Sequence, residues 1–536
     1  MLNYVWIAIL FLGIGAAVTT DIINTSSDKY RNNKEFPVEI IYKGEFDKKS
    51  PNNAVVNVRK EQFNKFYNEK IDKDLTLPTI VTFNQKNQSK YNVKLEKDSP
   101  KIWNDAAAVS GEKNDISGNV IIKEKLNDST YSGAIVLEEV SFVKMKEITN
   151  SALDYAATAV NISLGLIGIM AMWLGVMKVA EEAGLIRIIA KMLTPITKRL
   201  FPDVPTDHPA MGSMIMNISA NMLGLGNAAT PFGLKAMEEL DKLNPNKGTA
   251  TNAMVTFLAI NTAGMTLIPA SAIAIRSALG SADPALIIGT SLFGSTCATI
   301  VGLTAAKLLG GFNYEKGKFG AWVKNHIKGI FFFVAFLAII SLLIISGATS
   351  SMKFISADTF KAIIQVFSTI AIPLLIVIFI GYGFLKKVKV YEQFVEGAKE
   401  GFNVAIRIIP YLVAMLVAIG VFRTGGAMEW LIWLLTPLTN LIGMPAEALP
   451  MALMRPLSGS GSLGIMSEIM KVHGPDSFIG IMVSTFYGSS ETTFYVLAVY
   501  FGSVNIKNTR HALPVGLLAD LAGMLGAVFI VKLLFG

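Results

Sequence analysis

The chain has 536 residues, of which 52% are hydrophobic and 16% are charged, and its mean hydropathy is +0.47. These values exclude an ordinary soluble protein of this size and predict a polytopic membrane protein. The formal net charge of +8 would favour nucleic-acid binding in a soluble protein, but here the Lys and Arg residues lie mostly in short loops between apolar segments, so we expect no nucleic-acid partner.

The first predicted element is a transmembrane helix within residues 1–20, because Leu2 to Val18 form an apolar run. The run lacks a basic segment before it and an Ala-x-Ala-like site after it, so a retained helix is favoured over the alternative, a cleaved signal peptide. Residues 21–150 are polar and contain alternating runs such as TIVTF, from Thr79 to Phe83. They predict a small soluble β-rich insertion, an accessory or assembly domain without His or Cys.

Eight further apolar segments are predicted to span the membrane. They are Leu153 to Met177, Ala250 to Ala278, Pro284 to Lys307, Ile327 to Gly347, Ala362 to Lys386, Phe402 to Phe422, Phe478 to Phe501 and Ala512 to Phe535. Two other apolar stretches, residues 210–240 and 450–471, are split by LGLGNAATPFG and LSGSGSLG into pieces too short to span. We expect each of these stretches to form a re-entrant helical hairpin.

A displacement of the chain by 242 positions places Gly184 on Gly426 and the string LTPIT, at residues 193–197, on LTPLT, at 435–439. Beyond these strings the order of elements persists although the register slips. We therefore predict a first repeat at residues 151–311, a linker with an extra transmembrane helix at 312–361, and a second repeat at 362–536.

Loop charge predicts the orientation of these segments. The basic loops at residues 314–328 and 386–389 are expected inside, and counting outward from them makes the two repeats run in opposite senses. The same count places the N-terminus in the cytoplasm and the insertion on the outer side of a bacterial plasma (inner) membrane. The predicted fold is thus an all-α polytopic membrane protein with inverted repeats, re-entrant hairpins and discontinuous helices, plus the soluble insertion.

Each predicted repeat contains a long helix that is interrupted near its middle, at residues 259–271 and at 487–496. Irregular backbone survives in a membrane only where protein or a water-filled cavity surrounds it, and broken helices at the interface of inverted repeats are typical of secondary transporters. We therefore predict a solute site at the breaks. Its candidate residues are Asn221, Gly226, Asn227, Thr230, Asn261, Thr262, Ser458, Gly459, Ser460, Ser489, Ser490, Glu491 and Thr492.

Three charged residues, Arg455, Glu491 and Asp520, fall in apolar surroundings, where an unpaired charge is costly. An ion pair between Glu491 and Arg455 that only stabilises the fold is one interpretation. The other is that a carboxylate binds and releases a coupling proton or cation. The residues alone leave both open.

Several long motifs resemble the spore maturation proteins. NMLGLGNAATPFGLKAM, at residues 221–237, and FLAIN, at 257–261, resemble protein A, whereas RPLSGSG, HGPDSF, ETTFYVLAVYFG and TRHALPVGLLADL, between residues 455 and 521, resemble protein B. The resemblance implies a natural fusion of the two, each built on the nucleoside-recognition or gate domain, which is related to the membrane part of ferrous-iron transporter B. The insertion departs from the ordinary A protein.

The sequence contains no G-x-x-x-x-G-K-[ST] loop for nucleotide phosphates, so we expect transport that is not driven by NTP hydrolysis. The expected function is import or export of a small polar solute, nucleoside-like or amino-acid-like. The alternatives are a non-transporting membrane scaffold and passage of a divalent cation. We expect no enzyme activity, catalytic residue, cofactor or metal site. The expected partners are the lipid bilayer and the solute, and a homo-oligomer and an envelope partner for the insertion are further candidates.

Overall fold

The structure is a computed structural model that describes residues 2–43, 50–83, 89–96, 99–107, 115–224, 229–310 and 357–536, and single positions at 324, 327, 328, 331 and 335. It divides into two compact units, one formed mainly by residues 155–417 and 431–536 and one formed mainly by residues 7–154. The predicted span from Ile327 to Gly347 lies almost entirely outside the described residues. The site candidates Gly226 and Asn227 also lie outside them.

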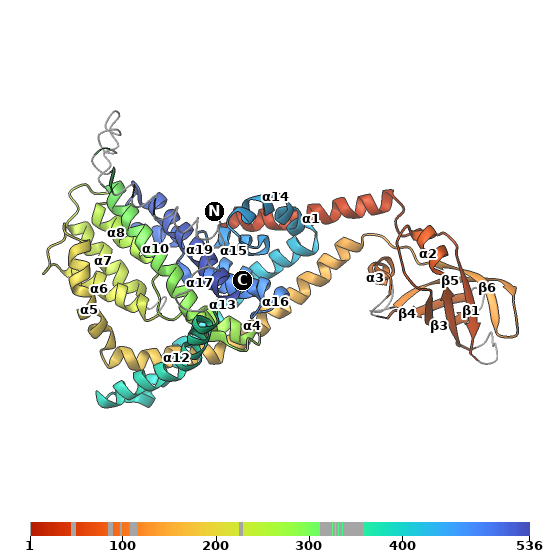
Figure 1. Cartoon of the computed structure of the whole chain (residues 1–536), viewed down its shortest axis with the longest axis horizontal. Helices are drawn as coiled ribbons and strands as arrows, with labels where there is room; N and C mark the ends of the chain where they lie inside the picture. Colours follow the sequence, from red (N-terminus) through yellow and green to blue (C-terminus); the bar gives the residue numbers. More distant parts are fainter. Residues whose placement is uncertain are drawn as a thin grey trace. The chain divides into compact units, whose positions relative to one another are not determined.

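The polar insertion folds into a closed six-stranded β-barrel (Figure 1). The strands are β1 (Phe36–Tyr42), β2 (Asn52–Val58), β3 (Leu75–Phe83), β4 (Ser89–Lys94), β5 (Asp115–Lys125) and β6 (Thr130–Leu137), with short helices α2 (Lys60–Tyr67) and α3 (Lys101–Ala107). Each strand pairs antiparallel with the next, and β6 pairs with β1, so the sheet has no free edge. The predicted soluble β-rich domain is confirmed in this form.

The barrel core follows from the alternation in the strands. In β1 and β2 every second residue is buried, and Phe36, Phe63, Tyr67 and Trp103 form an aromatic cluster within the barrel core. Ring centroids in this cluster lie 4.9 to 6.4 Å apart, a range in which aromatic pairs attract one another. Helices α2 and α3 therefore pack their apolar side chains against the barrel core.

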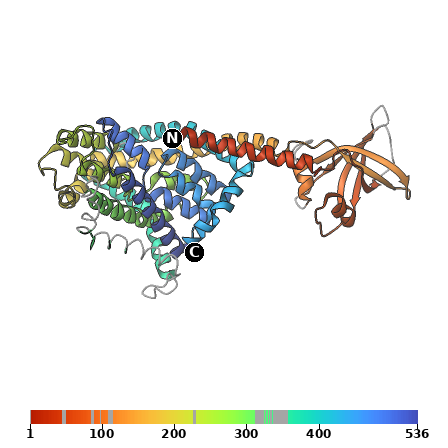
Figure 2. The same ribbon diagram turned by 90° about the horizontal axis from the view of Figure 1, so that it is seen from above.

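The barrel follows α1 (Leu2–Ser26) in the chain and precedes α4 (Val143–Glu182). The C-terminal end of α1 lies beside the N-terminal end of α4 (Figure 2). Asp21 of α1 is buried and its carboxylate accepts hydrogen bonds from the backbone N–H groups of Lys144 and Met145, at 2.9 and 3.0 Å. A carboxylate at the N-terminus of a helix satisfies free donors and complements the helix dipole. Helix α1 thus continues beyond the predicted end at residue 20, and α4 begins before residue 150.

The larger unit is helical. Its further helices are α5 (Leu185–Leu200), α6 (Pro209–Met222), α7 (Thr230–Lys242), α8 (Asn252–Ala263), α9 (Ala270–Ala278), η2 (Pro284–Leu286), α10 (Ile287–Gly310), α12 (Ala357–Leu385), α13 (Val390–Thr424), α14 (Ala427–Leu441), η4 (Ala446–Ala448), α15 (Leu449–Met454), α16 (Gly459–His473), α17 (Phe478–Ser489), α18 (Thr493–Ser503) and α19 (Ala512–Phe535). Within the described residues, five helices of the chain are long and apolar enough to cross a membrane, namely α1, α4, α10, α13 and α19. The chain is therefore a membrane protein.

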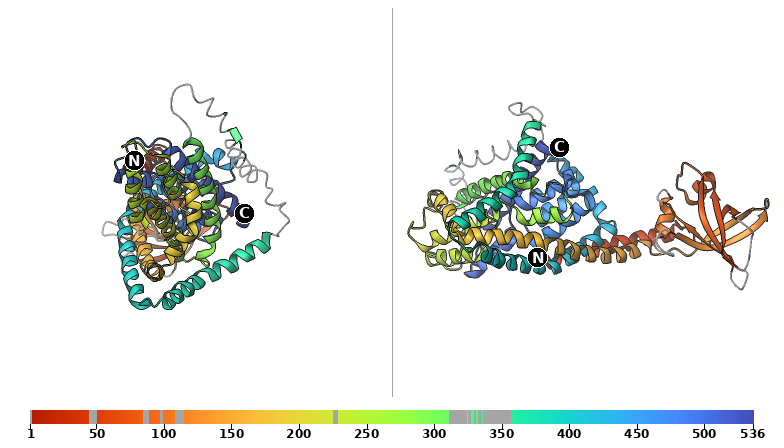
Figure 3. Two further views of the ribbon diagram at one scale, coloured as in Figure 1. Left: turned by 90° about the vertical axis from the view of Figure 1, so that its left-hand side faces the viewer. Right: turned by 90° about the horizontal axis from the view of Figure 1, so that it is seen from below.

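Helices α10 and α19 pack along each other (Figure 3), and small residues lie at their contact. A Cβ atom added to Gly302 of α10 would lie 3.1 Å from the Cβ of Ala519, and one added to Gly526 of α19 would lie 2.9 Å from the sulfur of Cys297. Small residues let helix backbones approach closely, which is how helices associate in lipid. The interrupted helices α8 and α17 pack against this pair.

The order of elements recurs along the helical unit. A helix leads to a left-handed glycine, Gly184 (φ +84°) or Gly426 (φ +93°), and then to a helix with an internal proline, Pro195 of α5 or Pro437 of α14. Two short helices follow, then an interrupted helix, then a long one. We call α4 to α10 the first helical segment and α12 to α19 the second.

Candidate functional site

Two helix interruptions meet at the centre of the helical unit. In the first segment α8 ends at Gly264, which has φ +56°, and α9 begins at Ala270. In the second segment α17 ends at Ser489 and α18 begins at Thr493. Both breaks fall within the ranges predicted from the sequence.

Direct backbone contact joins the two breaks. The N–H group of Glu491 donates to the carbonyl of Thr262 at 2.7 Å, so a carbonyl freed at the end of α8 is satisfied by the other segment. A Cβ atom added to Gly264 would lie 2.8 Å from the Cγ of Glu491 and 3.0 Å from its backbone nitrogen. The approach therefore requires glycine at 264 for two reasons, the positive φ and the space.

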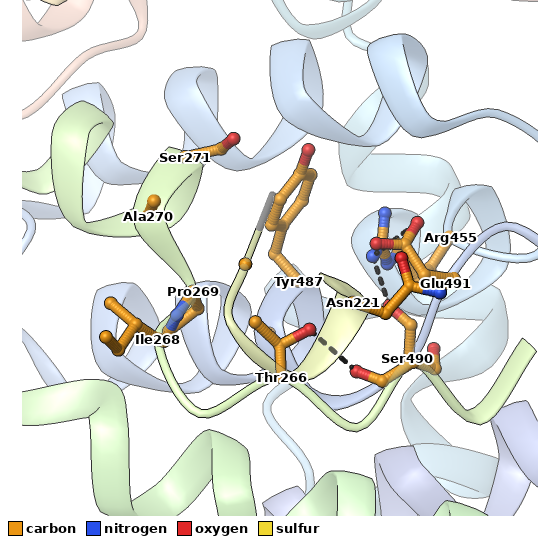
Figure 4. Close-up of a pocket in the computed structure, with 13 residues that line it drawn as sticks. Asn221, Thr266, Ile268, Pro269, Ala270, Ser271, Arg455, Tyr487, Ser490 and Glu491 are labelled. Atoms are coloured by element: carbon orange, nitrogen blue, oxygen red, sulfur yellow. Dashed lines mark hydrogen bonds and ion pairs between the residues drawn. The ribbon is translucent and has the colours of Figure 1, made fainter. Parts of the chain in front are cut away.

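A cavity of about 90 Å³ lies between the breaks (Figure 4). Residues from both segments line it: Asn221, Gly224, Gly264, Thr266, Ile268, Pro269, Ala270, Ser271, Arg455, Tyr487, Gly488, Ser490 and Glu491. Four of the residues predicted for the site are among them, namely Asn221, Arg455, Ser490 and Glu491. Thr266 and Tyr487 also line the cavity, and both lie inside the predicted breaks at residues 259–271 and 487–496.

Arg455 is the cation of this cavity, and its side chain is only 2% exposed. Its guanidinium donates to the carbonyl of Ser490, lies 3.6 Å from a carboxylate oxygen of Glu491, and stacks 4.2 Å from the ring centroid of Tyr487. Its Nε atom has no hydrogen-bond partner among the described residues. Glu491 is 52% exposed on its side chain, so the pair has one buried member and one that reaches the open side of the cavity.

A network of amide groups supports the first-segment side of the cavity. Asn221, at the end of α6, donates to the side-chain oxygen of Asn261 in α8 at 2.9 Å. The hydroxyl of Tyr500 in α18 donates to the same oxygen at 3.2 Å, and Asn217 donates to that hydroxyl at 3.3 Å. The predicted residue Asn261 is thus one layer behind the cavity. Its amide orients Asn221, which reaches the cavity.

Asp520 lies behind the second break, in α19, and is 1% exposed. One carboxylate oxygen accepts a hydrogen bond from the hydroxyl of Thr493 at 2.6 Å, and the other, Oδ1, has no partner among the described residues. Thr493 begins α18, so this hydrogen bond connects Asp520 to the break. No group of three or more His, Cys, Asp and Glu side chains suited to a metal ion occurs in the part of the chain that the structure describes.

The remaining predicted residues surround the cavity without lining it. Ser458 caps α16 by accepting from the backbone of Gly461 at 3.0 Å and lies 3.4 Å from the Ser460 hydroxyl. A Cβ added to Gly459 would lie 3.2 Å from the hydroxyl of Thr492, so these residues join the α16 tip to the second break. Two others point elsewhere. Ser489 donates to the carbonyl of Thr485 within α17, and Thr230 begins α7.

Sequence reasoning missed a buried arginine, Arg276, whose side chain is fully buried in α9. It donates to a carboxylate oxygen of Asp476 at 2.7 Å, to the hydroxyls of Ser281 and Ser484, and to backbone carbonyls at Pro475 and Asp283. Asp476 also accepts from the backbone N–H of Ala282 at 2.7 Å. We call this cluster the Arg276 latch. It ties the turn after α9 to the turn after α16.

A second contact reverses the roles of the two segments. It joins the turn after a short helix of the first segment, α7, to the turn after the interrupted helix of the second. Arg510, in the turn before α19, donates to the carbonyl of Ala250 at 3.1 Å and to the side chain of Asn252 at 3.0 Å. Backbone hydrogen bonds of 2.9 to 3.0 Å connect Gly248 to Lys507 and Asn508, and Asn508 to Ala250. We call this contact the Arg510 latch. It ties the turn after α7 to the turn after α18.

The comparisons with known proteins agree with the division of the helical unit into a first and a second segment. The family described as Gate, nucleoside recognition, matches residues 163–281 and 405–507, and every residue that lines the cavity falls within these two ranges. The chain is 53% identical to spore maturation protein B of Bacillus subtilis (strain 168) over 174 residues, which are 32% of this chain and 98% of that protein. It is 43% identical to spore maturation protein A of the same strain over 174 residues, 32% of this chain and 87% of that protein.

A more distant relative is the inner membrane protein YjiG of Escherichia coli (strain K12), which is 28% identical over 81 residues, 15% of this chain and 53% of that protein. No solved structure gives a significant match to the chain. The two near relatives each correspond to about a third of the chain, and the described cavity takes residues from both segments. The chain therefore belongs to the spore maturation protein A and B family, and it joins an A-like and a B-like part, with nucleoside-recognition gate sequence, in one membrane polypeptide.

Proposed function

We propose that this protein is a secondary transporter that moves a small polar solute through the membrane. The solute binds in the cavity between the two helix breaks. The observation that carries the proposal is the meeting of these breaks. The 2.7 Å hydrogen bond from Glu491 to Thr262 and the cavity beside it use residues from both segments. Unwound helices at the interface of two repeats are the arrangement by which many transporters bind solute and coupling ion.

The two segments act as inverted repeats, and α6 with α7, and α15 with α16, act as re-entrant hairpins. The two latches support this part of the proposal. The Arg276 latch joins the interrupted helix of the first segment to a short helix of the second, and the Arg510 latch joins a short helix of the first to the interrupted helix of the second. The Arg276 latch lies at the start of α10, through Asp283, and the Arg510 latch lies at its end, where Gly310 approaches Asn252. Helix α10 has 24 residues and so extends about 36 Å, close to the thickness of a membrane.

Alternating access follows from this arrangement. One latch lies near each membrane face, with the cavity between them, so opening one latch while the other stays closed exposes the cavity to one side at a time. Both latches join the segments by a few hydrogen bonds around one arginine. Such contacts have two discrete states, made and broken.

Asp520 is our candidate for the group that couples solute movement to a proton or cation. It is buried, one of its oxygens is unpartnered among the described residues, and Thr493 connects it to the break that carries Glu491. The three charged groups Arg455, Glu491 and Asp520 together carry a net charge of −1 when ionised. A buried charge requires compensation, and a proton or a cation bound at Asp520 supplies it.

The test is solute flux into proteoliposomes containing the purified chain, with and without an imposed proton or sodium gradient. Accumulation that follows either gradient, and that Asp520→Asn uncouples while leaving exchange of solute intact, is the expected result. Gradient-driven accumulation by Asp520→Asn equal to that of the unmodified protein would overturn the coupling role. Absence of flux for every solute and ion tested would favour the non-transporting scaffold instead.

The relatives' names add a physiological setting to the proposal. A spore maturation role, plasma (inner) membrane location, a cytoplasmic N-terminus and an outward-facing barrel that contacts an envelope partner are parts of the same proposal. The family description, nucleoside recognition, makes nucleosides the first solutes to test. The alternative of a divalent cation is tested in the same vesicles with a fluorescent indicator.

A further inference from the structure

We propose that the cavity selects a small zwitterion, a compound of the α-amino acid class, rather than a nucleoside. This inference rests on the proposed function, since it names the solute of the same cavity. Four features of the cavity carry it: its charges, its helix ends, its aromatic content and its volume.

The described part of the chain contributes one cation and one anion to the cavity lining. Arg455 and Glu491 are the charged residues among those that line it, and their nearest charged atoms lie 3.6 Å apart. An α-amino acid carries an ammonium and a carboxylate on one carbon, so it can meet both groups at once. The unpartnered Nε of Arg455 and the half-exposed carboxylate of Glu491 are the groups with capacity for this. A neutral nucleoside uses neither charge.

The helix ends around the cavity also provide partial charges of both signs, from the helix dipoles. The first turn of α9 contributes Ala270 and Ser271 to the lining, and a helix N-terminus favours an anion. The ends of α8 and α17 contribute Gly264 and Gly488, and a helix C-terminus favours a cation. The backbone thus stabilises a carboxylate on one side of the cavity and an ammonium on another.

Recognition of a base usually needs an aromatic surface on which the base stacks. Among the described residues that line the cavity, Tyr487 is the single aromatic one, and the guanidinium of Arg455 lies over its ring at 4.2 Å. That face of the ring is therefore covered. A nucleobase would have to displace a buried arginine to reach it.

The volume of the cavity also favours a small zwitterion over a nucleoside. The cavity measures about 90 Å³, whereas pockets for drug-sized ligands measure about 300 to 1,000 Å³. A volume of about 90 Å³ lies well below that range and favours a small solute over a nucleoside.

The experiment measures binding to the purified full chain in detergent by calorimetry, with four probes: L-alanine, propionate, ethylamine and uridine. Propionate retains only the anionic group and ethylamine only the cationic group. We expect L-alanine to bind at least about tenfold more tightly than either single-charge probe, and uridine to show no saturable binding. Equal affinities for L-alanine and propionate, or saturable binding of uridine without L-alanine, would overturn the proposal.

A variant separates the role of Glu491 from general damage. Glu491→Gln should remove most of the preference for L-alanine over propionate, to within about twofold. Glu400→Gln, at an exposed position in α13, is the matched control and should keep the preference. Arg455→Lys, which keeps the charge but loses the planar group, should weaken propionate and L-alanine together. A Glu491→Gln protein that is folded and keeps the full preference would contradict the assignment.

Flux separates this inference from the proposed function. Exchange of L-alanine, but not of uridine, across proteoliposomes supports both. Exchange of uridine without L-alanine leaves the transporter proposal standing and refutes the zwitterion. Saturable L-alanine binding without any flux supports the ligand class and refutes transport.

Discussion

Replacing Gly264 with alanine should separate the two helix breaks. Gly264 has φ +56°, where an L-residue costs about 1 to 2 kcal/mol. The added Cβ would lie 2.8 Å from the Cγ and 3.0 Å from the backbone nitrogen of Glu491, closer than side-chain carbons normally come. Since that nitrogen belongs to the hydrogen bond with Thr262, relief requires a backbone shift, and such overpacking costs about 1 to 3 kcal/mol more.

The matched control is Gly184→Ala. Gly184 has φ +84° at the start of α5, and nothing lies within 4 Å of the position of its Cβ, so this variant has the backbone strain without the overlap. We expect Gly264→Ala to lose about 2 to 5 kcal/mol of stability and Gly184→Ala about 1 to 2 kcal/mol. Melting temperatures in detergent and exchange rates in proteoliposomes provide the measurements. Equal melting and equal exchange for the two variants would refute the contact between the breaks.

Three further predictions concern topology, protonation and the Arg276 latch. A cysteine at Asp128, which is fully exposed in the barrel, should be labelled from outside intact cells and one at Lys387 should not; equal labelling would refute the inverted orientation. Burial, and then the charge of Arg510, lower the pKa of His511 from its ordinary 6.5 to about 4. The contribution of the neutral imidazole to the free energy of unfolding is therefore complete above pH 6.5 and is lost as the pH falls toward 4. About 2 kcal/mol should be lost by pH 5, and His511→Asn, measured by thermal melting, should flatten this dependence. Asp476→Asn should lower stability by about 1 to 3 kcal/mol, because it removes the charge that faces the fully buried Arg276 and replaces one of the two acceptor oxygens with an NH2 donor; unchanged melting would contradict the latch.

Much of the fold could be predicted because the relevant patterns are local. Apolar length predicted the long helices, and alternation predicted strands in the insertion, although the barrel closure between β1 and β6 depends on pairing that no local pattern encodes. The helix breaks were predictable for a similar reason. Gly264, Pro269 and the run from Gly488 to Ser490 are poor helix formers in sequence that is otherwise apolar.

The candidate site was only partly predictable because its members are chosen by contacts between distant residues. Arg276 and Asp476 are 200 positions apart, and nothing in AIAIRSALG identifies the partner. Ser489 and Ser490 are adjacent and chemically alike, but Ser489 donates back into its own helix whereas Ser490 lines the cavity. Asn261 has the right chemistry in the right break, yet it lies behind Asn221. Sequence locates such groups to a region but does not decide which of them face the solute.

The connection between the barrel and the helices bears on whether the barrel can be removed. The two chain segments that enter and leave the barrel are joined next to α1 and α4, where the side chain of Asn32 both donates to the carbonyl of Val140 and accepts from its N–H, each at 3.0 Å, and where Asp21 caps α4. A domain whose entry and exit lie side by side can be inserted into a loop, or removed from it, with little displacement of the flanking elements. We therefore expect the membrane part to tolerate replacement of the barrel by a short turn between α1 and α4. That shortened chain is the simplest form in which to ask whether the membrane part works alone.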